Sequence, residues 1–245
     1  TTVVVVVGSS GVEAAKGVYY YMTTVLKHSV TWGVNGTGDR LGSLPLPPPP
    51  LPTTTITTTA ATAFGYYMNV CTYGYSMMWW KWPRWEREID WAALHGVNLP
   101  LAFTGQEKVW QRLWREVGVK NDEIEKWLSG PAFLAWQRMG NLRKWGGPLP
   151  QHWIDARATL QKQILARMLQ FGMIPVLPGF AGFVPEAITT LFPNANISKS
   201  PNWWAAPDDI CCVSLLEPTD ALYAQFGKRF YQLYADQYGA NISHV

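Results

Sequence analysis

The hydrophobic positions of the chain fall into short apolar runs separated by longer amphipathic stretches. Runs at 64–70, 97–103 and 173–177 have the length of strands. The second and third are apolar almost throughout, as expected for strands of a parallel sheet that is buried on both faces. Because each run is followed by a segment with helical periodicity, the pattern predicts a parallel α/β arrangement.

Apolar residues recur every three or four positions in the stretches between these runs, which predicts amphipathic helices. Pro83 is placed to begin one of them, and Gly96, Gly172 and Gly239 to end three. A fourth strand is predicted over 241–245. The predicted helices cover 83–95, 105–116, 122–128, 131–139, 154–171, 185–192 and 219–238.

The first 42 residues predict a separate small α/β domain. The β-branched run 3–7 favours a strand. Ser9 or Ser10 can cap a helix over 11–28, and 29–32 is a second predicted strand, which completes a βαβ unit. The segment 43–63 contains four consecutive prolines and a Thr/Ala run, and is predicted to be a linker.

Residues 64–245 are predicted to form the first half of a (β/α)8 TIM-type barrel. They contain four predicted strands, whereas a complete barrel needs eight and typically about 250 residues. We therefore expect the remainder of the barrel to lie outside this sequence, because a parallel sheet with a bare edge is prone to aggregate.

Composition and charge narrow the functional classes. The net charge of +3 is mild, and the chain has no block of Lys and Arg of the kind that binds nucleic acid. No apolar run reaches the roughly 18 residues of a membrane span. The histidines have no metal-ligand spacing and are expected at the surface or at caps. We expect no cofactor.

Cysteines and glycosylation motifs bear on the compartment. Three sequons begin at Asn35, Asn196 and Asn241 and favour a secreted or lumenal protein, although Asn241 falls in a predicted strand. Adjacent cysteines rarely bond each other. We therefore expect one of Cys211 and Cys212 to bridge to a partner outside this segment, and Cys71 to be a free thiol.

Tryptophan and a side-chain amide mark the candidate binding site. The stretch 69–111 is dense in tryptophan, an apolar flat residue suited to the carbon face of a sugar ring. Asn69 and Cys71 lie where the first barrel strand ends, and an amide there can bind hydroxyls or simply brace the turn. Trp85 is expected in the core. Trp136 and the pair Trp203–Trp204 fall after strands and are the better candidates for stacking on a ligand.

Two glutamates are candidates for catalysis or for structure. Glu107 follows the second barrel strand, but with Thr104 it also fits a capping box, which we favour. Glu186 lies in the first turn of a predicted helix, where a negative charge suits the helix dipole, and is expected to be structural.

Three long motifs stand out in the chain: YYMNVCTYGYSMMWWKWPRWEREIDWAALHGVNLPLAFTGQEKVWQ, GPAFLAWQRMGNLRKWGGPLP and FGMIPVLPGFAGFVPEAI. They resemble the α-N-acetylglucosaminidases, the lysosomal glycoside hydrolases that remove terminal α-linked N-acetylglucosamine from heparan sulfate. The resemblance covers about three quarters of the chain. The pair Cys211–Cys212 is closer to plant and algal members.

The resemblance implies a retaining mechanism with two glutamates, one acid/base and one nucleophile. Both are expected beyond Val245, so this segment alone should be inactive. The residues that match the family's sugar pocket are Asn69, Cys71, Trp136 and one of Trp203 and Trp204, of which we favour Trp203. Asn141 is a further candidate. The implied partner is a glycan ending in N-acetylglucosamine, the implied location is the lysosome, the vacuole or the exterior, and Asn35 and Asn196 are expected glycosylation sites. Homo-oligomers or a larger assembly are also expected.

Two other hypotheses remain open. The chain could be a non-catalytic relative that serves as a structural or carbohydrate-binding part of a larger assembly. It could also be an unrelated α/β barrel enzyme that uses Glu107.

Overall fold

The computed structural model describes residues 3–33 and 51–239. The predicted strand 241–245 and the sequons at Asn35 and Asn241 lie outside the described residues. The chain divides into two compact units. One comprises Thr1–Met68, Lys81–Leu101 and Gln163–Pro175, and the other comprises Asn69–Trp80, Ala102–Lys162 and Val176–Val245. The predicted domain limits at 42 and 63 stay predictions, although residues 51–63 form neither helix nor strand.

The N-terminal segment contains a helix but not the predicted βαβ unit. Helix α1 spans Gly11–Thr24, and the Ser10 side chain caps it by accepting a hydrogen bond from the backbone of Glu13 at 3.2 Å. The flanking runs 3–7 and 29–32 are not strands, and Val7 is 87% exposed. A β-branched run becomes a strand only where a neighbouring strand pairs with it, and none does so among residues 3–33 and 51–239.

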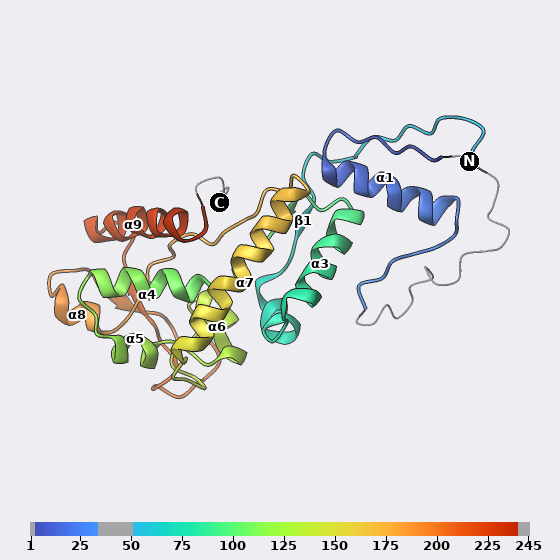
Figure 1. Ribbon diagram of the computed structural model, residues 1–245. Coiled ribbons are helices and arrows are strands. Elements are labelled where there is room, and N and C mark those ends of the chain that lie inside the picture. Colours follow the sequence, from blue (N-terminus) through green and yellow to red (C-terminus); the bar gives the residue numbers. More distant parts are fainter. Residues whose placement is uncertain (1–2, 34–50, 240–245) are drawn as a thin grey trace. The chain divides into compact units, whose positions relative to one another are not determined.

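In the first unit, α1 packs beside helix α3, which spans Trp82–Leu94 (Figure 1). Pro83 lies in the first turn of α3 as predicted, and Gly96 follows its end with a φ of +77°. Trp85 and Ile89 are each 2% exposed, which confirms them as core residues. The predicted boundaries of α3 therefore hold to within one residue.

The parallel pairing of the first two barrel strands is confirmed, but both strands are short. Strand β1 is Tyr66–Tyr67 and strand β2 is Leu99–Pro100, paired in parallel with Tyr66 opposite Leu99. The third predicted strand, 173–177, is joined to the second by two backbone hydrogen bonds. The Ile174 N–H donates to the Asn98 carbonyl at 2.7 Å, and the Ala102 N–H donates to the Val176 carbonyl at 2.8 Å. It forms bridges rather than a continuous strand.

The predicted helices after residue 105 are present within a few residues of their expected ends. In the second unit α4 packs along α9, with Trp114 and Phe230 fully buried among their aromatic neighbours. Asp220 caps α9 and Gly239 follows its last residue. The helical elements are α2 Val70–Thr72, a π-helical turn Tyr73–Met77, α4 Gln106–Glu116, α5 Asn121–Trp127, a 3₁₀ turn Pro131–Phe133, α6 Leu134–Arg138, α7 Gln151–Gln170, α8 Ala187–Leu191 and α9 Ala221–Tyr238.

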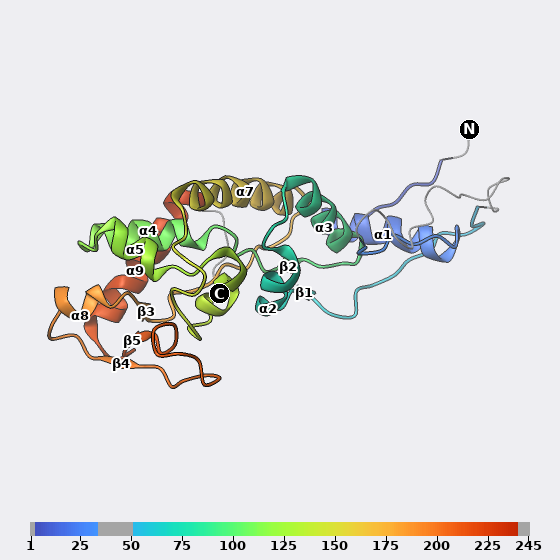
Figure 2. The same ribbon diagram turned by 90° about the horizontal axis from the view of Figure 1, so that it is seen from below.

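A three-stranded antiparallel sheet was not predicted. It places β5, Ser214–Leu216, between β3, Phe183–Val184, and β4, Ile197–Lys199 (Figure 2). These strands have two or three residues each, too few for a periodic pattern to reveal them. The sheet forms part of the long connection between the bridged segment 173–177 and α9.

Candidate functional site

Asn69 lies directly after the first barrel strand and begins helix α2. Its Oδ1 accepts a hydrogen bond from the backbone N–H of Cys71 at 2.7 Å, so it braces the turn as one of the two predicted roles requires. The residue is exposed. Among the described residues its Nδ2 group has no hydrogen-bond partner, and this donor is available to a ligand. Its sugar-binding role stays a prediction.

Cys71 is a free, half-buried cysteine, as predicted. Its sulfur lies 3.9 Å from the sulfur of Met139, at the end of helix α6. This contact connects the segment after the first strand with the helix that carries Trp136.

Trp136 lies against the segment that Asn69 begins. Its ring meets the ring of Tyr75 edge-on at 5.3 Å between centroids. A Cβ atom on Gly74 would come within 2.8 Å of the Trp136 Cζ3 atom, so the close approach needs glycine. Asn141 donates its backbone N–H to the Trp136 carbonyl at 3.0 Å. The structure thus brings Asn69, Cys71, Trp136 and Asn141 onto two adjoining segments of one unit.

Trp203 belongs to a different aromatic group. It is 51% exposed and its ring is 5.8 Å from that of Trp204. Trp204 in turn lies 4.9 Å from Trp145, which stacks on Phe133 at 4.2 Å. No hydrogen bond or ring contact joins Trp203 to Asn69 or Trp136 within the described residues, and its membership of the pocket stays a prediction.

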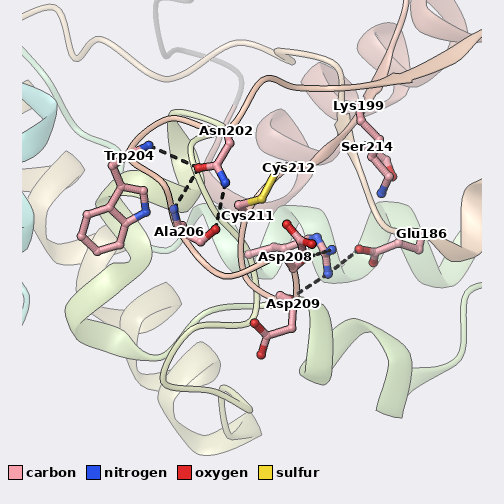
Figure 3. Close-up of a disulfide and its surroundings, with 11 residues drawn as sticks. Glu186, Lys199, Asn202, Trp204, Ala206, Asp208, Asp209, Cys211, Cys212 and Ser214 are labelled. Atoms are coloured by element: carbon pink, nitrogen blue, oxygen red, sulfur yellow. Dashed lines mark hydrogen bonds and ion pairs between the residues drawn. A yellow bond between two sulfur atoms is a disulfide. The ribbon is translucent and has the colours of Figure 1, made fainter.

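The segment 202–212, hereafter the tryptophan loop, is folded on itself by Asn202. The side chain of Asn202 accepts from the backbone N–H of Ala206 at 2.9 Å and donates to the Ala206 carbonyl at 2.8 Å (Figure 3). It also accepts from Trp204 at 3.4 Å. The loop therefore presents Trp203 and Trp204 from a closed turn.

The expected pairing of the cysteines is wrong. Cys211 and Cys212 are bonded to each other at the end of the tryptophan loop (Figure 3). Successive side chains of an extended chain point to opposite faces. Cys212 has a left-handed backbone with a φ of +63°, which breaks this alternation and lets the two sulfurs meet.

The capping box predicted for Glu107 is also wrong. Helix α4 begins at Gln106 with Gly105 as its N-cap residue, and the Thr104 hydroxyl donates to Tyr73 at 3.1 Å. Glu107 is instead paired with Arg138, with Nε–Oε1 and Nη2–Oε2 distances of 2.7 and 3.0 Å. The carboxylate is neutralised by a buried cation, which disfavours the hypothesis of a catalytic Glu107.

Arg138 and Arg143 are the residues that sequence reasoning missed. Arg138 follows Trp136 by two positions, and its guanidinium lies 4.6 Å from the ring of Tyr73. Its partner Glu107 is 31 residues away, so no local spacing marks the pair. Arg143 pairs with Glu186 at 2.7 Å, which agrees with the structural role expected of that glutamate.

The histidines add no residue to the candidate site. His28 is buried, contrary to the expectation of a surface position, whereas His95 caps the C-terminal end of α3. In the part of the chain that the structure describes, no three His, Cys, Asp or Glu side chains gather as a metal site would require. Within 3–33 and 51–239, none of the helices combines the length and apolarity that crossing a membrane demands.

Comparison with known proteins shows the family to which the chain belongs. The model of the alpha-N-acetylglucosaminidase (NAGLU) TIM-barrel domain matches residues 65–245. The chain therefore belongs to the alpha-N-acetylglucosaminidase family.

Individual relatives agree with this assignment. The chain is 44% identical to the human alpha-N-acetylglucosaminidase over 96% of its own length, and spans 31% of that protein. Two structures of a family 89 glycoside hydrolase from Clostridium perfringens, one with 2-acetamido-1,2-dideoxynojirmycin and one with its substrate GlcNAc-alpha-1,4-galactose, are each 30% identical to the chain. They superpose with TM-scores of 0.85 and 0.86 over 97% of this chain and 26% of theirs.

Proposed function

We propose that the chain is part of a glycoside hydrolase that removes terminal α-linked N-acetylglucosamine. The identity with the human relative carries this proposal, because it extends over 96% of the chain. The bacterial relative, whose substrate contains a terminal α-linked N-acetylglucosamine, supports the same substrate class.

We further propose that the chain supplies one wall of the sugar pocket in a partial TIM barrel. Asn69 offers a side-chain amide to the sugar hydroxyls, and Trp136 offers a flat apolar face for the ring. Both lie on segments braced by hydrogen bonds, one from the Cys71 N–H to the Asn69 side chain and one from the Asn141 N–H to the Trp136 carbonyl, which suits a site that must keep its shape. Cys71, Asn141 and Trp203 complete the proposed set.

The chemistry requires two carboxylates that the proposed site does not contain. In a retaining mechanism one carboxyl group protonates the leaving oxygen while the other attacks the sugar carbon, at a separation of about 5–5.5 Å. Among the candidate glutamates, Glu107 and Glu186 are both held by arginines. We propose that the catalytic pair lies outside residues 1–245.

The proposed setting follows from the family. We propose a lysosomal, vacuolar or secreted protein, glycosylated at Asn35 and Asn196. Asn196 is exposed just before β4, where a glycan would have room. The partners are then a glycan ending in N-acetylglucosamine and the remainder of the barrel.

Hydrolysis by the natural full-length protein tests the function. We expect release of nitrophenol from the nitrophenyl α-N-acetylglucosaminide, with the α-anomer of the sugar as the first product. The β-anomer of the substrate is the matched control and should remain intact. Binding of N-acetylglucosamine in calorimetry without any turnover would instead support the carbohydrate-binding alternative.

A further inference from the structure

Strained backbone is concentrated around the tryptophan loop. Four non-glycine residues among those described have a positive φ, and three of them are Lys144, Ala205 and Cys212, at +63°, +59° and +63°. A left-handed conformation costs free energy for such residues and persists only where the surroundings impose it. Contacts that hold the loop against this strain are therefore expected close by.

Arg143 supplies three of these contacts to consecutive carbonyl groups. Its backbone N–H donates to Ile210 at 2.8 Å, and its guanidinium donates through Nη1 to the Asp209 carbonyl at 3.1 Å and through Nη2 to the Asp208 carbonyl at 3.2 Å. Figure 3 shows Asp208 and Asp209 beside Glu186, whose carboxylate pairs with the same guanidinium at 2.7 Å. Only 8% of Arg143 is exposed. A buried two-pronged donor of this kind cannot be replaced by lysine, which is a single point charge.

The neighbours of Arg143 extend the same attachment in both directions. Leu142 forms an antiparallel bridge with Cys211, next to the disulfide. Trp145 meets the ring of Trp204 at 4.9 Å. The segment 142–145 thus contacts the tryptophan loop at several points between residues 204 and 211. The side-chain hydrogen bonds among these contacts come from Arg143.

We propose that Arg143 is a positioning residue for glycan binding: its guanidinium fixes the tryptophan loop so that Trp203 is held ready for the sugar. This inference rests on the proposed function, because it assigns Arg143 a role in the same pocket. It does not require Arg143 to touch the glycan. A rigid indole lowers the entropy lost on binding, so loosening it weakens substrate binding more than it slows the chemical step.

Hydrogen exchange tests the attachment independently of catalysis. The natural protein is compared with Arg143→Lys and with Arg229→Lys, a matched exchange at an exposed pair with Glu116. We expect the amides of 202–212 to exchange at least about 10-fold faster in R143K, and at an unchanged rate in R229K. Equal exchange of the loop in both variants would overturn the proposal, whether or not the protein is an enzyme.

Kinetics test whether the loop acts through its tryptophan. With the nitrophenyl α-N-acetylglucosaminide we expect R143K to raise KM about 10-fold and to leave kcat within about 2-fold. Adding R143K to Trp203→Ala should then raise KM by less than about 2-fold further, because the group that Arg143 positions is already gone. Full additivity, or a loss confined to kcat, would overturn the proposal. An inactive natural protein would sink the proposed function, while the exchange comparison would still decide whether Arg143 holds the loop.

Discussion

Glu107 and Arg138 form a two-point ion pair, and both side chains are at most 2% exposed. Burial alone would lower the pKa of the Arg138 guanidinium, but the charge of Glu107 beside it raises that pKa above its ordinary value. The guanidinium also lies against the rings of Tyr73 and Phe103, at 4.6 and 4.7 Å from their centroids. The pair thereby connects α4 and α6 with the segment that follows Asn69.

Replacing Glu107 by Gln should destabilise the protein rather than remove a catalytic group. The change leaves the Arg138 charge buried without its partner, at a cost of about 3–5 kcal/mol in the free energy of unfolding. Glu116→Gln, at the exposed pair with Arg229, is the control and should have a much smaller effect. Urea unfolding measures both. A fully stable E107Q protein that has lost all turnover would contradict this account and revive a catalytic Glu107.

Replacing Gly74 by Ala should displace Trp136. The added Cβ atom would lie 2.8 Å from the Trp136 ring and 3.1 Å from the Cβ atom of Ala135, so something must shift. We expect a loss of about 1–3 kcal/mol of stability and a higher KM. Gly227→Ala, inside α9, is the matched control: its Cβ would have an ordinary contact with the Phe180 ring at 3.7 Å, and a stabilisation of about 0.5–1 kcal/mol is expected. Equal effects of the two exchanges in calorimetric unfolding and in KM would contradict the packing described.

Glu88 should make stability fall as the pH rises. Burial raises its pKa, and the hydrogen bonds from Tyr67 and Trp32 and the charge of Arg84 only partly oppose this. The folded state therefore holds the Glu88 proton more tightly than the unfolded chain. The resulting contribution to stability is full below the unfolded pKa of about 4.3 and is lost as the pH rises through the higher folded value.

The direction of this pH dependence is checked by measuring the unfolding of the wild type and of Glu88→Gln at roughly pH 4 to pH 7. The wild type should lose stability relative to E88Q as the pH increases. Glu116→Gln provides the opposite case when the measurement is extended below about pH 4, since the hydrogen bond from Arg229 lowers the pKa of Glu116 and its contribution is lost as the pH falls. A difference between wild type and E88Q that does not vary with pH would show that Glu88 is not desolvated.

The cysteine pairing can be read from an unreduced tryptic digest. Cleavage after Lys199 and Lys228 should release one peptide that contains both Cys211 and Cys212, lighter by two hydrogen atoms than its reduced form. Cys71 should be alkylated without prior reduction. A cross-linked peptide joining Cys71 or another chain to either of the pair would contradict the disulfide.

The local sequence pattern was sufficient to predict an element where that element's own residues determine its structure. Helix α3 could be predicted from Pro83, Gly96 and the apolar spacing of Trp85 and Ile89, because these act within one helix. The run 3–7 misled because β-branching favours a strand only where a partner exists. The antiparallel sheet around β5 depends on pairings between distant short segments, which leave no period in the sequence.

In the candidate site, too, some residues could be predicted from the local sequence and others could not. Asn69 and Trp136 could be proposed from the sequence because each follows a predicted strand and matches a family motif. Arg138 could not, because its partner Glu107 is distant in sequence and Thr104 offered a plausible local cap. The bond between Cys211 and Cys212 depends on the left-handed backbone of Cys212, which the amino-acid sequence does not indicate.

The most direct test of the account is the kcat/KM of single variants of the natural protein on the nitrophenyl α-N-acetylglucosaminide. Asn69→Ala and Trp136→Ala remove the proposed amide and sugar wall, and Trp79→Ala is the control, since Trp79 is 61% exposed and contacts Trp153. We predict that N69A and W136A each lower kcat/KM about 100-fold. We predict that W79A stays within about 2-fold. Values for N69A and W136A as close to wild type as that of W79A would contradict the proposed pocket.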